Sequence, residues 1–221
     1  MAHEPPRAVG SEMQIRAVIG LGNPGKQYAS TRHNVGFVVI ERLAARLGAQ
    51  WSSKFNSNFA KARIAKPGAD LDLLLLQPLG YMNLSGHAVQ PMAAFFAMPP
   101  QSLLVVHDDL DLPFGRIQVK MGGGHGGHNG LRSIAAQLAT TDFARVRVGI
   151  GRPGADPSGE GSLKGGADAV SDWVLSPFGA SERAELPDLV DRAVRAIEDV
   201  VCLGVRTAMN THNGAAVKAK P

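Results

Sequence analysis

The sequence contains a single cysteine, Cys202, among its 221 residues. One thiol cannot form an intramolecular disulfide, and a chain of this length without disulfides fits the reducing cytoplasm. Cys202 stands in an apolar stretch of helical character, so we expect it to be a buried hydrophobic residue. The class of small disulfide-stabilised extracellular domains is therefore excluded, and a cytoplasmic protein is favoured.

Long apolar runs are missing as well. No run reaches the roughly 18 residues that a transmembrane helix requires, so we expect no membrane partner. The N-terminal residues also lack the apolar segment of a signal peptide, and we expect no secretory leader.

A strong excess of one charge is absent, because 23 Lys and Arg stand against 19 Asp and Glu, for a net charge of +4. An excess this small does not by itself indicate nucleic-acid binding, and the distribution of charge is more informative. Acidic residues gather between positions 182 and 199, whereas one segment is rich in bases: Arg116, Lys120, Arg132, Arg145, Arg147 and Arg152. This asymmetry predicts one basic face.

Hydrophobic periodicity is missing at both ends of the chain. Residues 1–13 carry Pro and Gly without a pattern, and we interpret them as a disordered leader or a cloning remnant, with Met13 as a candidate natural start. We expect residues 207–221 to be a frayed tail. Residues 14–206 contain no repeat and no dividing linker, which predicts a single domain.

Within that domain, short apolar stretches alternate with segments of helical periodicity. We expect strands at residues 15–20, 59–66, 71–77, 103–107, 117–121 and 144–150. We expect helices at residues 34–48, 84–96, 129–139 and 181–203, and a long Gly/Pro/Ser-rich loop at 152–170. This alternation predicts an α/β fold. The two neighbouring strands between residues 59 and 77 predict an antiparallel pair, and hence a mixed sheet.

The stretch "VIGLGNPGKQYASTRHNVG" contains Gly20, Gly22 and Gly25 with the G-x-G-x-x-G spacing of a dinucleotide-binding turn. That turn requires a helix directly after the glycines and an acidic residue at the end of a second strand. Here "KQYASTRH" separates the glycines from the first helical periodicity, and Glu41, at about the right offset, falls inside the expected helix. The context of the motif argues against dinucleotide binding.

Three further polar clusters stand where expected strands end or expected helices begin. They are "YMNLSG" at 81–86, "HDDLDLPFG" at 107–115 and "GGGHGGHNG" at 122–130. Open α/β sheets bind ligands at such places.

Taken in order, "GLGNPGKQYASTRHNVG", "MNLSG", "HDDLDLP" and "GGGHGGHNGLRS" closely resemble the motifs of the bacterial peptidyl-tRNA hydrolase family. The likeness runs from about residue 15 to about residue 210. It implies a twisted mixed β-sheet surrounded by α-helices, in a cytoplasmic monomer that needs no cofactor. It further implies hydrolysis of the ester between a peptide and the terminal ribose of tRNA, which recycles prematurely released peptidyl-tRNA.

Ester hydrolysis requires an activated nucleophile, and His33 is the candidate general base. His33 stands at the expected start of a helix, whose positive end would disfavour the protonated ring. Asp108 matches the family residue that orients the ring and stabilises the imidazolium. Without a G-x-S-x-G motif, and with no motif around Cys202, an attacking water is preferable to a covalent intermediate. Taken alone, His33 could equally be a helix-capping or surface histidine.

The resemblance also implies substrate contacts. Asn23 matches the residue that distinguishes peptidyl-tRNA from free aminoacyl-tRNA, although it could also be a plain turn residue before Pro24. Asn83 and Asn129 match substrate-binding positions, with helix capping as the alternative. Tyr28 and Tyr81 match substrate contacts and could stack on an unpaired base; without the resemblance they would be ordinary half-buried aromatic residues.

Lys120 and Arg147 match basic family residues that hold a tRNA phosphate, and the glycines between them offer backbone N–H groups to the same ligand. Both could equally be solvated surface charges. The histidines at 107, 125 and 128 do not have the spacing of a known metal site, so we expect no metal. We expect His128 to brace the loop beside Asn129. The 152–170 loop could be a lid or a plain surface loop.

Two other functions remain open from the sequence. One is a catalytically silent RNA-binding module of the same fold, against which the intact Asn23, His33 and Asp108 argue. The other is an oxidoreductase with a nucleotide cofactor.

Overall fold

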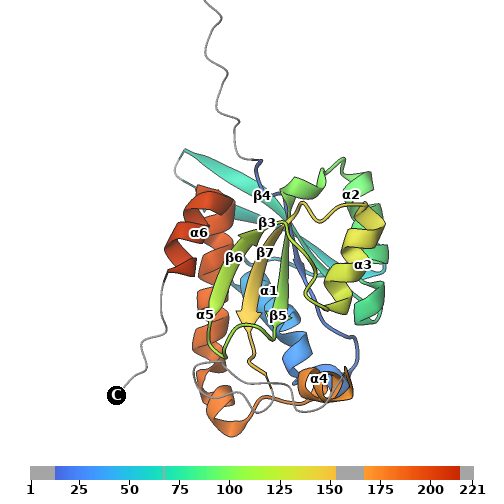
Figure 1. Ribbon diagram of the computed structural model, residues 1–221. Helices are drawn as coiled ribbons and strands as arrows, with labels where there is room; N and C mark the ends of the chain where they lie inside the picture. Colours follow the sequence, from blue (N-terminus) through green and yellow to red (C-terminus); the bar gives the residue numbers. More distant parts are fainter. Residues whose placement is uncertain (1–12, 67, 153–166, 215–221) are drawn as a thin grey trace, which may run out of the picture.

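In the computed structural model, the structure describes residues 13–66, 68–152 and 167–214. The strands in these ranges form one seven-stranded sheet in the order β2-β3-β4-β1-β5-β7-β6. Helices pack on both faces of the twisted sheet (Figure 1). The predicted α/β fold with a mixed sheet is therefore confirmed.

The centre of the sheet is parallel and its flanks are antiparallel. The parallel strands are β4 (Ala69–Pro78), β1 (Ala17–Gly20), β5 (Leu103–Asp109) and β7 (Ala144–Gly149). The flanking strands are β2 (Ser52–Lys54), β3 (Ser57–Lys66) and β6 (Ile117–Met121). Because β4, β1 and β5 are parallel, their carboxyl ends meet at one edge, and the clusters at 81–86 and 107–115 lie at the ends of β4 and β5 there.

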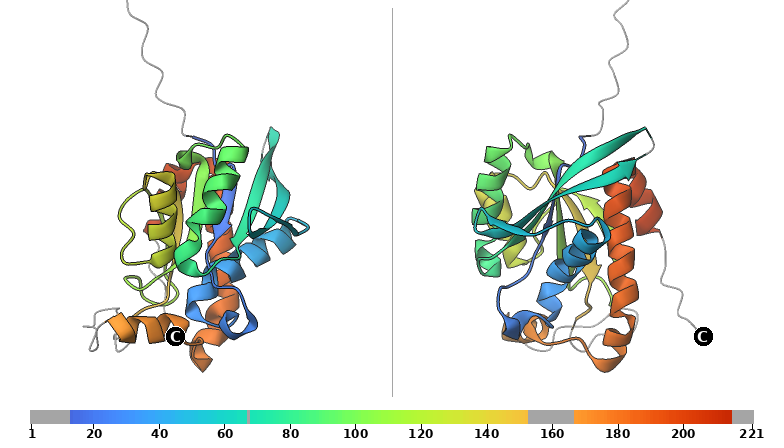
Figure 2. Two further views of the ribbon diagram at one scale, coloured as in Figure 1. Left: turned by 90° about the vertical axis from the view of Figure 1, so that its right-hand side faces the viewer. Right: turned by 180° about the vertical axis from the view of Figure 1, so that it is seen from behind.

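The helices form two layers with the sheet between them (Figures 1 and 2). One face is covered by α1 (Val35–Arg46), α5 (Ala180–Leu203) and α6 (Val205–Asn213). The other face is covered by α2 (Gly86–Phe95) and α3 (Asn129–Leu138). The remaining helix, α4 (Ala167–Leu175), lies beyond the carboxyl ends of the parallel strands (Figure 1).

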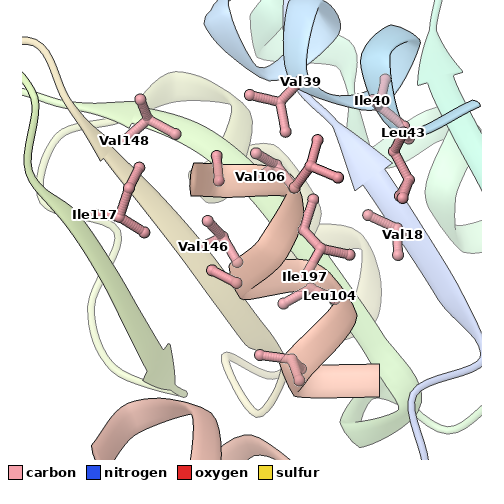
Figure 3. Packing of buried hydrophobic residues seen from close by; sticks show 14 of the residues in the cluster. Val18, Val39, Ile40, Leu43, Leu104, Val106, Ile117, Val146, Val148 and Ile197 are labelled. Atoms are coloured by element: carbon pink, nitrogen blue, oxygen red, sulfur yellow. The ribbon is translucent and has the colours of Figure 1, made fainter. Parts of the chain in front are cut away.

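Alternate residues of the central strands fill two separate cores. Val18 and Val106 point to the α1 and α5 side, while Ile19 and Val105 belong to the core under α2 and α3. Figure 3 shows the first core, in which Ile197 of α5 lies over the sheet near Leu104 and Val146. Each fully buried side chain of this size contributes roughly 1.5–3 kcal/mol to folding.

The connection between β1 and α1 depends on two glycines packed against each other. A Cβ atom on Gly20 would lie 2.4 Å from the carbonyl oxygen of Gly36, and one on Gly36 would lie 2.5 Å from the carbonyl oxygens of Leu21 and Val106. Of the three glycines in the G-x-G-x-x-G spacing, only Gly25 has a left-handed φ, at 108°. Gly20 and Gly22 therefore serve close packing rather than the turn itself.

In the described ranges, four short 3-10 helices lie in the connections: η1 (Lys26–Tyr28), η2 (Arg32–Asn34), η3 (Met82–Leu84) and η4 (Pro100–Ser102). The first two occupy the stretch that delays α1, which begins only at Val35. Glu41 lies in α1 and accepts a hydrogen bond from Gln77 at 3.0 Å. The arrangement of a dinucleotide-binding turn is thus absent from this described segment.

Three expectations about the C-terminal part need correction. The predicted tail begins with helix α6, which the weak apolar pattern of "VRTAMNTHN" does not reveal. Tertiary contacts stabilise it, since the Asn213 side chain accepts from the Val119 N–H at 2.8 Å and donates to the Val119 carbonyl at 2.9 Å. Cys202 is partly exposed rather than buried, because it lies on the flank of α5.

The predicted 152–170 loop is also partly helical, because α4 begins at Ala167. The portion 153–166 lies outside the described residues, as do 1–12 of the expected leader and 215–221 of the expected tail.

Strand β2 was not expected, and its three exposed residues, "SSK", carry no apolar alternation. No helix in the described ranges has the length and apolar character needed to cross a membrane.

Candidate active site

A pocket of about 950 Å³ opens at the carboxyl ends of β1 and β5. Its walls come from the loops after β1, β4 and β5, the glycine-rich loop before α3 with the N-terminal end of that helix, β6, β7 and one side of α4. Eight of the nine residues that the sequence singles out line it: Asn23, His33, Tyr81, Asn83, Asp108, Lys120, Asn129 and Arg147. Tyr28 lies on η1, half-buried, and is not among the lining residues.

His33 and Asp108 meet although 75 positions separate them in the chain. His33 lies on η2, and Asp108 lies near the end of β5, which extends to Asp109 rather than ending at His107. The Nδ1 atom of His33 lies 2.9 Å from Oδ1 of Asp108, and both residues are more than 90% buried. The carboxylate therefore holds the proton on Nδ1 and leaves Nε2 with a free lone pair, the arrangement a general base needs.

A second histidine shares the same carboxylate oxygen. Nε2 of His128 lies 3.0 Å from Oδ1 of Asp108. Nδ1 of His128 accepts hydrogen bonds from the backbone N–H groups of Gly130 and Leu131, at 3.1 and 3.4 Å, and so caps α3. An accepting Nδ1 carries no proton, so His128 is a neutral ring that donates from Nε2 to Asp108.

These contacts set the charges of the site. Burial alone lowers the pKa of His33, but the charge and the hydrogen bond of Asp108 outweigh burial and raise that pKa above its ordinary value of 6.5. Burial opposes ionisation of Asp108, yet His33 and then His128 hold the pKa of this carboxyl well below its usual range. The net pKa of His33 is thus raised despite its place at the start of a helix, because the buried carboxylate at 2.9 Å is the stronger influence.

His107 lies beside this cluster and is fully buried. Its Nδ1 atom donates to the backbone carbonyl of Asp108 at 2.7 Å, while its Nε2 atom has no hydrogen-bond partner in the described structure. Its ring packs edge-on against His128, with 5.0 Å between the ring centroids. Burial is the largest cause that lowers the pKa of His107, to about 3. His107 is therefore a neutral support of the site.

Asn23 is buried and has two partners, one for its backbone and one for its side chain. The backbone of Asn23 exchanges hydrogen bonds with the Asn34 side chain, at 2.8 and 2.9 Å, which ties the loop after β1 to the start of α1. The side-chain oxygen of Asn23 accepts from the N–H of Met82 at 2.8 Å. The Oδ1 atom is therefore occupied by the Met82 N–H. The Nδ2 group of Asn23, which lines the pocket, is left as a hydrogen-bond donor.

Tyr81, Asn83 and Asn129 are polar residues of the pocket that are exposed. Tyr81 has 57% of its surface exposed and Asn83 is also open to solvent. Asn129 is the first residue of α3 and accepts a hydrogen bond from Arg132 at 2.7 Å. Since His128 caps α3, the capping alternative for Asn129 does not apply, and its amide N–H₂ group remains able to donate.

Lys120 and Arg147 differ in their surroundings. The Arg147 guanidinium is bound to Asp109 at 2.7 Å and to Gln118. Lys120 forms no salt bridge with any described residue, and its ammonium group lies beside Gly123, 2.9 Å from where a Cβ would be. Lys120 is thus the cation of this pair that is available to a phosphate.

The sequence did not reveal that Arg32 holds the loop that carries His33 in place. Arg32 is 4% exposed and lies over the Trp173 ring of α4, 3.7 Å from the ring centroid. It also donates to Glu182 of α5 at 2.6 Å and to the carbonyl of Pro177 at 2.8 Å. These contacts hold α4, a wall of the pocket, beside His33. The only sequence signal is that Arg32 precedes His33.

The shared carboxylate also invites a test of metal binding. Ligating atoms of His33, Asp108 and His128 lie within 4.8 Å of one another. A histidine that binds a metal through Nε2 donates from Nδ1, but Nδ1 of His128 accepts from Gly130. The capping role of His128 therefore argues against a metal at this position and for a hydrogen-bonded cluster.

The sequence of the chain is similar to those of proteins whose family is known. A family model described as peptidyl-tRNA hydrolase matches residues 17–220. The peptidyl-tRNA hydrolase of Sorangium cellulosum is 50% identical over 197 residues, covering 89% of this chain and 82% of the relative. That of Mycobacterium marinum is 47% identical over 193 residues, covering 87% and 94%.

Solved structures agree with these matches. A crystal structure of a peptidyl-tRNA hydrolase in complex with N-propanol superimposes with a TM-score of 0.80 and 38% identity, covering 94% of this chain and all of that one. The peptidyl-tRNA hydrolase of Acinetobacter baumannii gives a TM-score of 0.78 at 38% identity, covering 93% and 98%.

Proposed function

Since the chain belongs to the peptidyl-tRNA hydrolase family and is a hydrolase, we propose that it cleaves the ester between peptide and tRNA with water activated by His33. The observation that supports this mechanism is the hydrogen bond between Nδ1 of His33 and buried Asp108, which leaves Nε2 of His33 as a base in a polar pocket. The proposal includes recycling of tRNA from prematurely released peptidyl-tRNA.

In the proposed reaction, Nε2 of His33 takes a proton as the water oxygen bonds to the ester carbonyl carbon. Asp108 stabilises the imidazolium that forms, as a carboxylate does in a hydrolytic triad. When the tetrahedral intermediate collapses, the bond to the ribose oxygen breaks and His33 returns the proton to that oxygen. His128 acts through Asp108, whose orientation it fixes by a second hydrogen bond.

Asn23 is proposed to select substrates with a blocked amino group. Its oxygen is occupied by Met82, so it offers the Nδ2 donor, which suits the carbonyl of a peptide bond. A free ammonium group is itself a donor and finds no acceptor there. Asn83, Asn129 and the exposed Tyr81 would contact the peptide or the unpaired end of the tRNA.

The basic lining is proposed to hold the tRNA backbone, with Lys120 as the principal phosphate ligand and Arg147 beside it. Tyr28, outside the pocket, would contact substrate only beyond the pocket rim. The proposal also includes a cytoplasmic monomer without a cofactor, as the motif resemblance implies.

The test is hydrolysis of an N-acetylated aminoacyl-tRNA and of the same aminoacyl-tRNA with its amino group free. The wild-type protein should cleave the blocked substrate and discriminate strongly against the free one. Asn23→Asp keeps an oxygen that accepts from Met82 but replaces the Nδ2 donor. It should therefore reduce this discrimination at least tenfold, which corresponds to a difference in binding free energy of about 1.4 kcal/mol. Binding of tRNA without hydrolysis would instead indicate a silent RNA-binding module.

A further inference from the structure

We propose that Arg145 is a positioning residue that shapes an anion-binding nest from the glycine run, defined as residues 122–127. It does so by turning two backbone N–H groups, those of Gly124 and His125, outward to bind a phosphate of the tRNA. The nature of the ligand rests on the proposed function, whereas the nest itself is a property of the chain that an inorganic anion can probe.

Arg145 is tied to the glycine run by two consecutive carbonyl groups. Its side chain donates from Nη2 to the Gly123 carbonyl at 2.6 Å and from Nη1 to the Gly124 carbonyl at 2.7 Å. The residue is 3% exposed, and its guanidinium carbon lies 4.8 Å from the centroid of the Phe143 ring. The planar guanidinium thereby fixes the orientation of two successive peptide planes.

The orientation of these planes determines where their N–H groups point. In a trans peptide the C=O and N–H bonds point in opposite directions. With the carbonyls of Gly123 and Gly124 turned to Arg145, the N–H groups of Gly124 and His125 point away from it. Neither N–H is hydrogen-bonded within the described part of the chain, and both residues line the pocket. Successive free N–H groups of this kind form an anion-binding nest.

The glycines make this path of the backbone possible. Gly122, Gly123, Gly126 and Gly127 have left-handed φ angles of 62°, 93°, 55° and 81°. Side chains at these positions would be strained. Gly124 has no left-handed φ, and a Cβ atom there would meet nothing within 4 Å.

The electrostatic setting favours an anion at the nest. Arg145 forms no ion pair among the described residues, and its buried charge is stabilised by two carbonyl dipoles, by the Phe143 ring and by the more distant Asp109 carboxylate. Its Nε atom is buried without a hydrogen-bond partner. The Lys120 ammonium lies beside Gly123 and could bind the same phosphate that the two N–H groups hold. Because Arg145 is 3% exposed and both of its terminal nitrogens donate to carbonyls of the glycine run, Arg145 acts through this run rather than on the ligand.

Amide NMR spectra of the full chain, recorded while inorganic phosphate is added, test the nest directly. The wild-type protein should show saturable downfield shifts of the Gly124 and His125 amide protons. Arg145→Gln should lose them, and Arg145→Lys, which can reach only one carbonyl, should retain a fraction. Arg63→Gln is the matched control, because Arg63 is an exposed arginine of β3 paired with Asp72. It should behave as wild type.

Equal shifts in wild type and Arg145→Gln would overturn the role of Arg145, and absent shifts in wild type would overturn the nest. Shifts that do not saturate would indicate an adventitious ion only and would also contradict the proposal. The same spectra report whether Arg145→Gln is folded.

A second pair of variants tests the N–H group without touching Arg145. Gly124→Pro removes the N–H of residue 124, whereas Gly124→Ala retains it and adds a Cβ into open space. The KM for N-acetylated aminoacyl-tRNA should be about tenfold higher for the Pro variant than for the Ala variant. The loss of one charge-assisted hydrogen bond to the phosphate predicts a difference of this size. The kcat values should differ far less. Equal KM values would contradict the nest. If the wild-type protein cleaved no such substrate, the proposed function would fail, while the phosphate titration would still decide the role of Arg145.

Discussion

The Oδ1 atom of Asp108 lies 2.9 Å from Nδ1 of His33, and both residues are buried at the edge of one pocket. The same oxygen accepts a second hydrogen bond from neutral His128. One carboxylate thus orients the candidate base, and it is itself held in place by a ring that caps α3. The consequences of this relationship can be measured.

The pH dependence of hydrolysis tests the influence of Asp108 on His33. A general base works only when unprotonated, so kcat/KM should fall in acid with an apparent pKa above 6.5 in the wild-type protein, because Asp108 raises the pKa of His33 against the effect of burial. In Asp108→Asn the amide oxygen can still accept both hydrogen bonds, but only burial acts on the ring. The acid limb should therefore move to lower pH, and the plateau should fall by roughly 10²-fold. An acid limb at the same pH in both proteins would contradict the role of Asp108.

The acid stability of the fold tests the neutral state of His107. Its pKa is lowered to about 3 in the folded protein, against 6.5 for an ordinary histidine. Below pH 6.5 the unfolded chain takes up a proton that the folded chain does not, so this residue makes the free energy of unfolding fall as the pH drops toward 3. The slope for one proton is about 1.4 kcal/mol per pH unit.

His107→Asn retains a donor for the Asp108 carbonyl and cannot titrate. Denaturant unfolding between pH 6 and pH 4 should therefore give a flatter dependence for the variant than for the wild-type protein. Parallel curves would show that His107 is protonated in the folded state.

The salt dependence of tRNA binding tests Lys120. An ammonium group that neutralises one phosphate releases about one counterion, so Lys120→Ala should weaken binding of any tRNA and reduce the slope of log Kd against log salt by roughly 0.7–0.9. Lys61→Ala, an exposed lysine of β3 outside the pocket, is the control for the loss of one charge. An unchanged slope in Lys120→Ala would remove this residue from the phosphate site.

The fold and the pocket could be predicted from the sequence to different degrees. The central strands could be located because buried parallel strands leave continuous apolar runs, as in "LLVV" before His107. Helix α6 could not, since its stability comes from contacts such as Asn213 with Val119 rather than from its own periodicity. Helix α4 could not be predicted either, because it directly follows a glycine-rich segment in the sequence.

The motifs pointed to the candidate site residues, but contacts between residues distant in sequence needed the structure. Nothing in the order of residues shows that His128 shares the oxygen of Asp108 with His33, or that Met82 occupies the Asn23 oxygen. Arg145 and Arg147 look alike in "ARVRV", yet one binds the glycine run and the other binds Asp109. Both side chains lie on the same face of β7, and their positions along the strand explain the difference. Arg145 is buried near the start of β7, whereas Arg147 is half-exposed and lies two residues farther along, opposite His107 of β5 and Gln118 of β6.

The most direct test of the proposed mechanism is the single-turnover rate of hydrolysis of N-acetylated aminoacyl-tRNA by wild-type protein and by His33→Ala. Single turnover removes product release from the comparison, so the rate reports the chemical step. Loss of a general base predicts a decrease of roughly 10²–10⁴-fold. A rate for His33→Ala within a few-fold of wild type would contradict the assignment of His33 as the base.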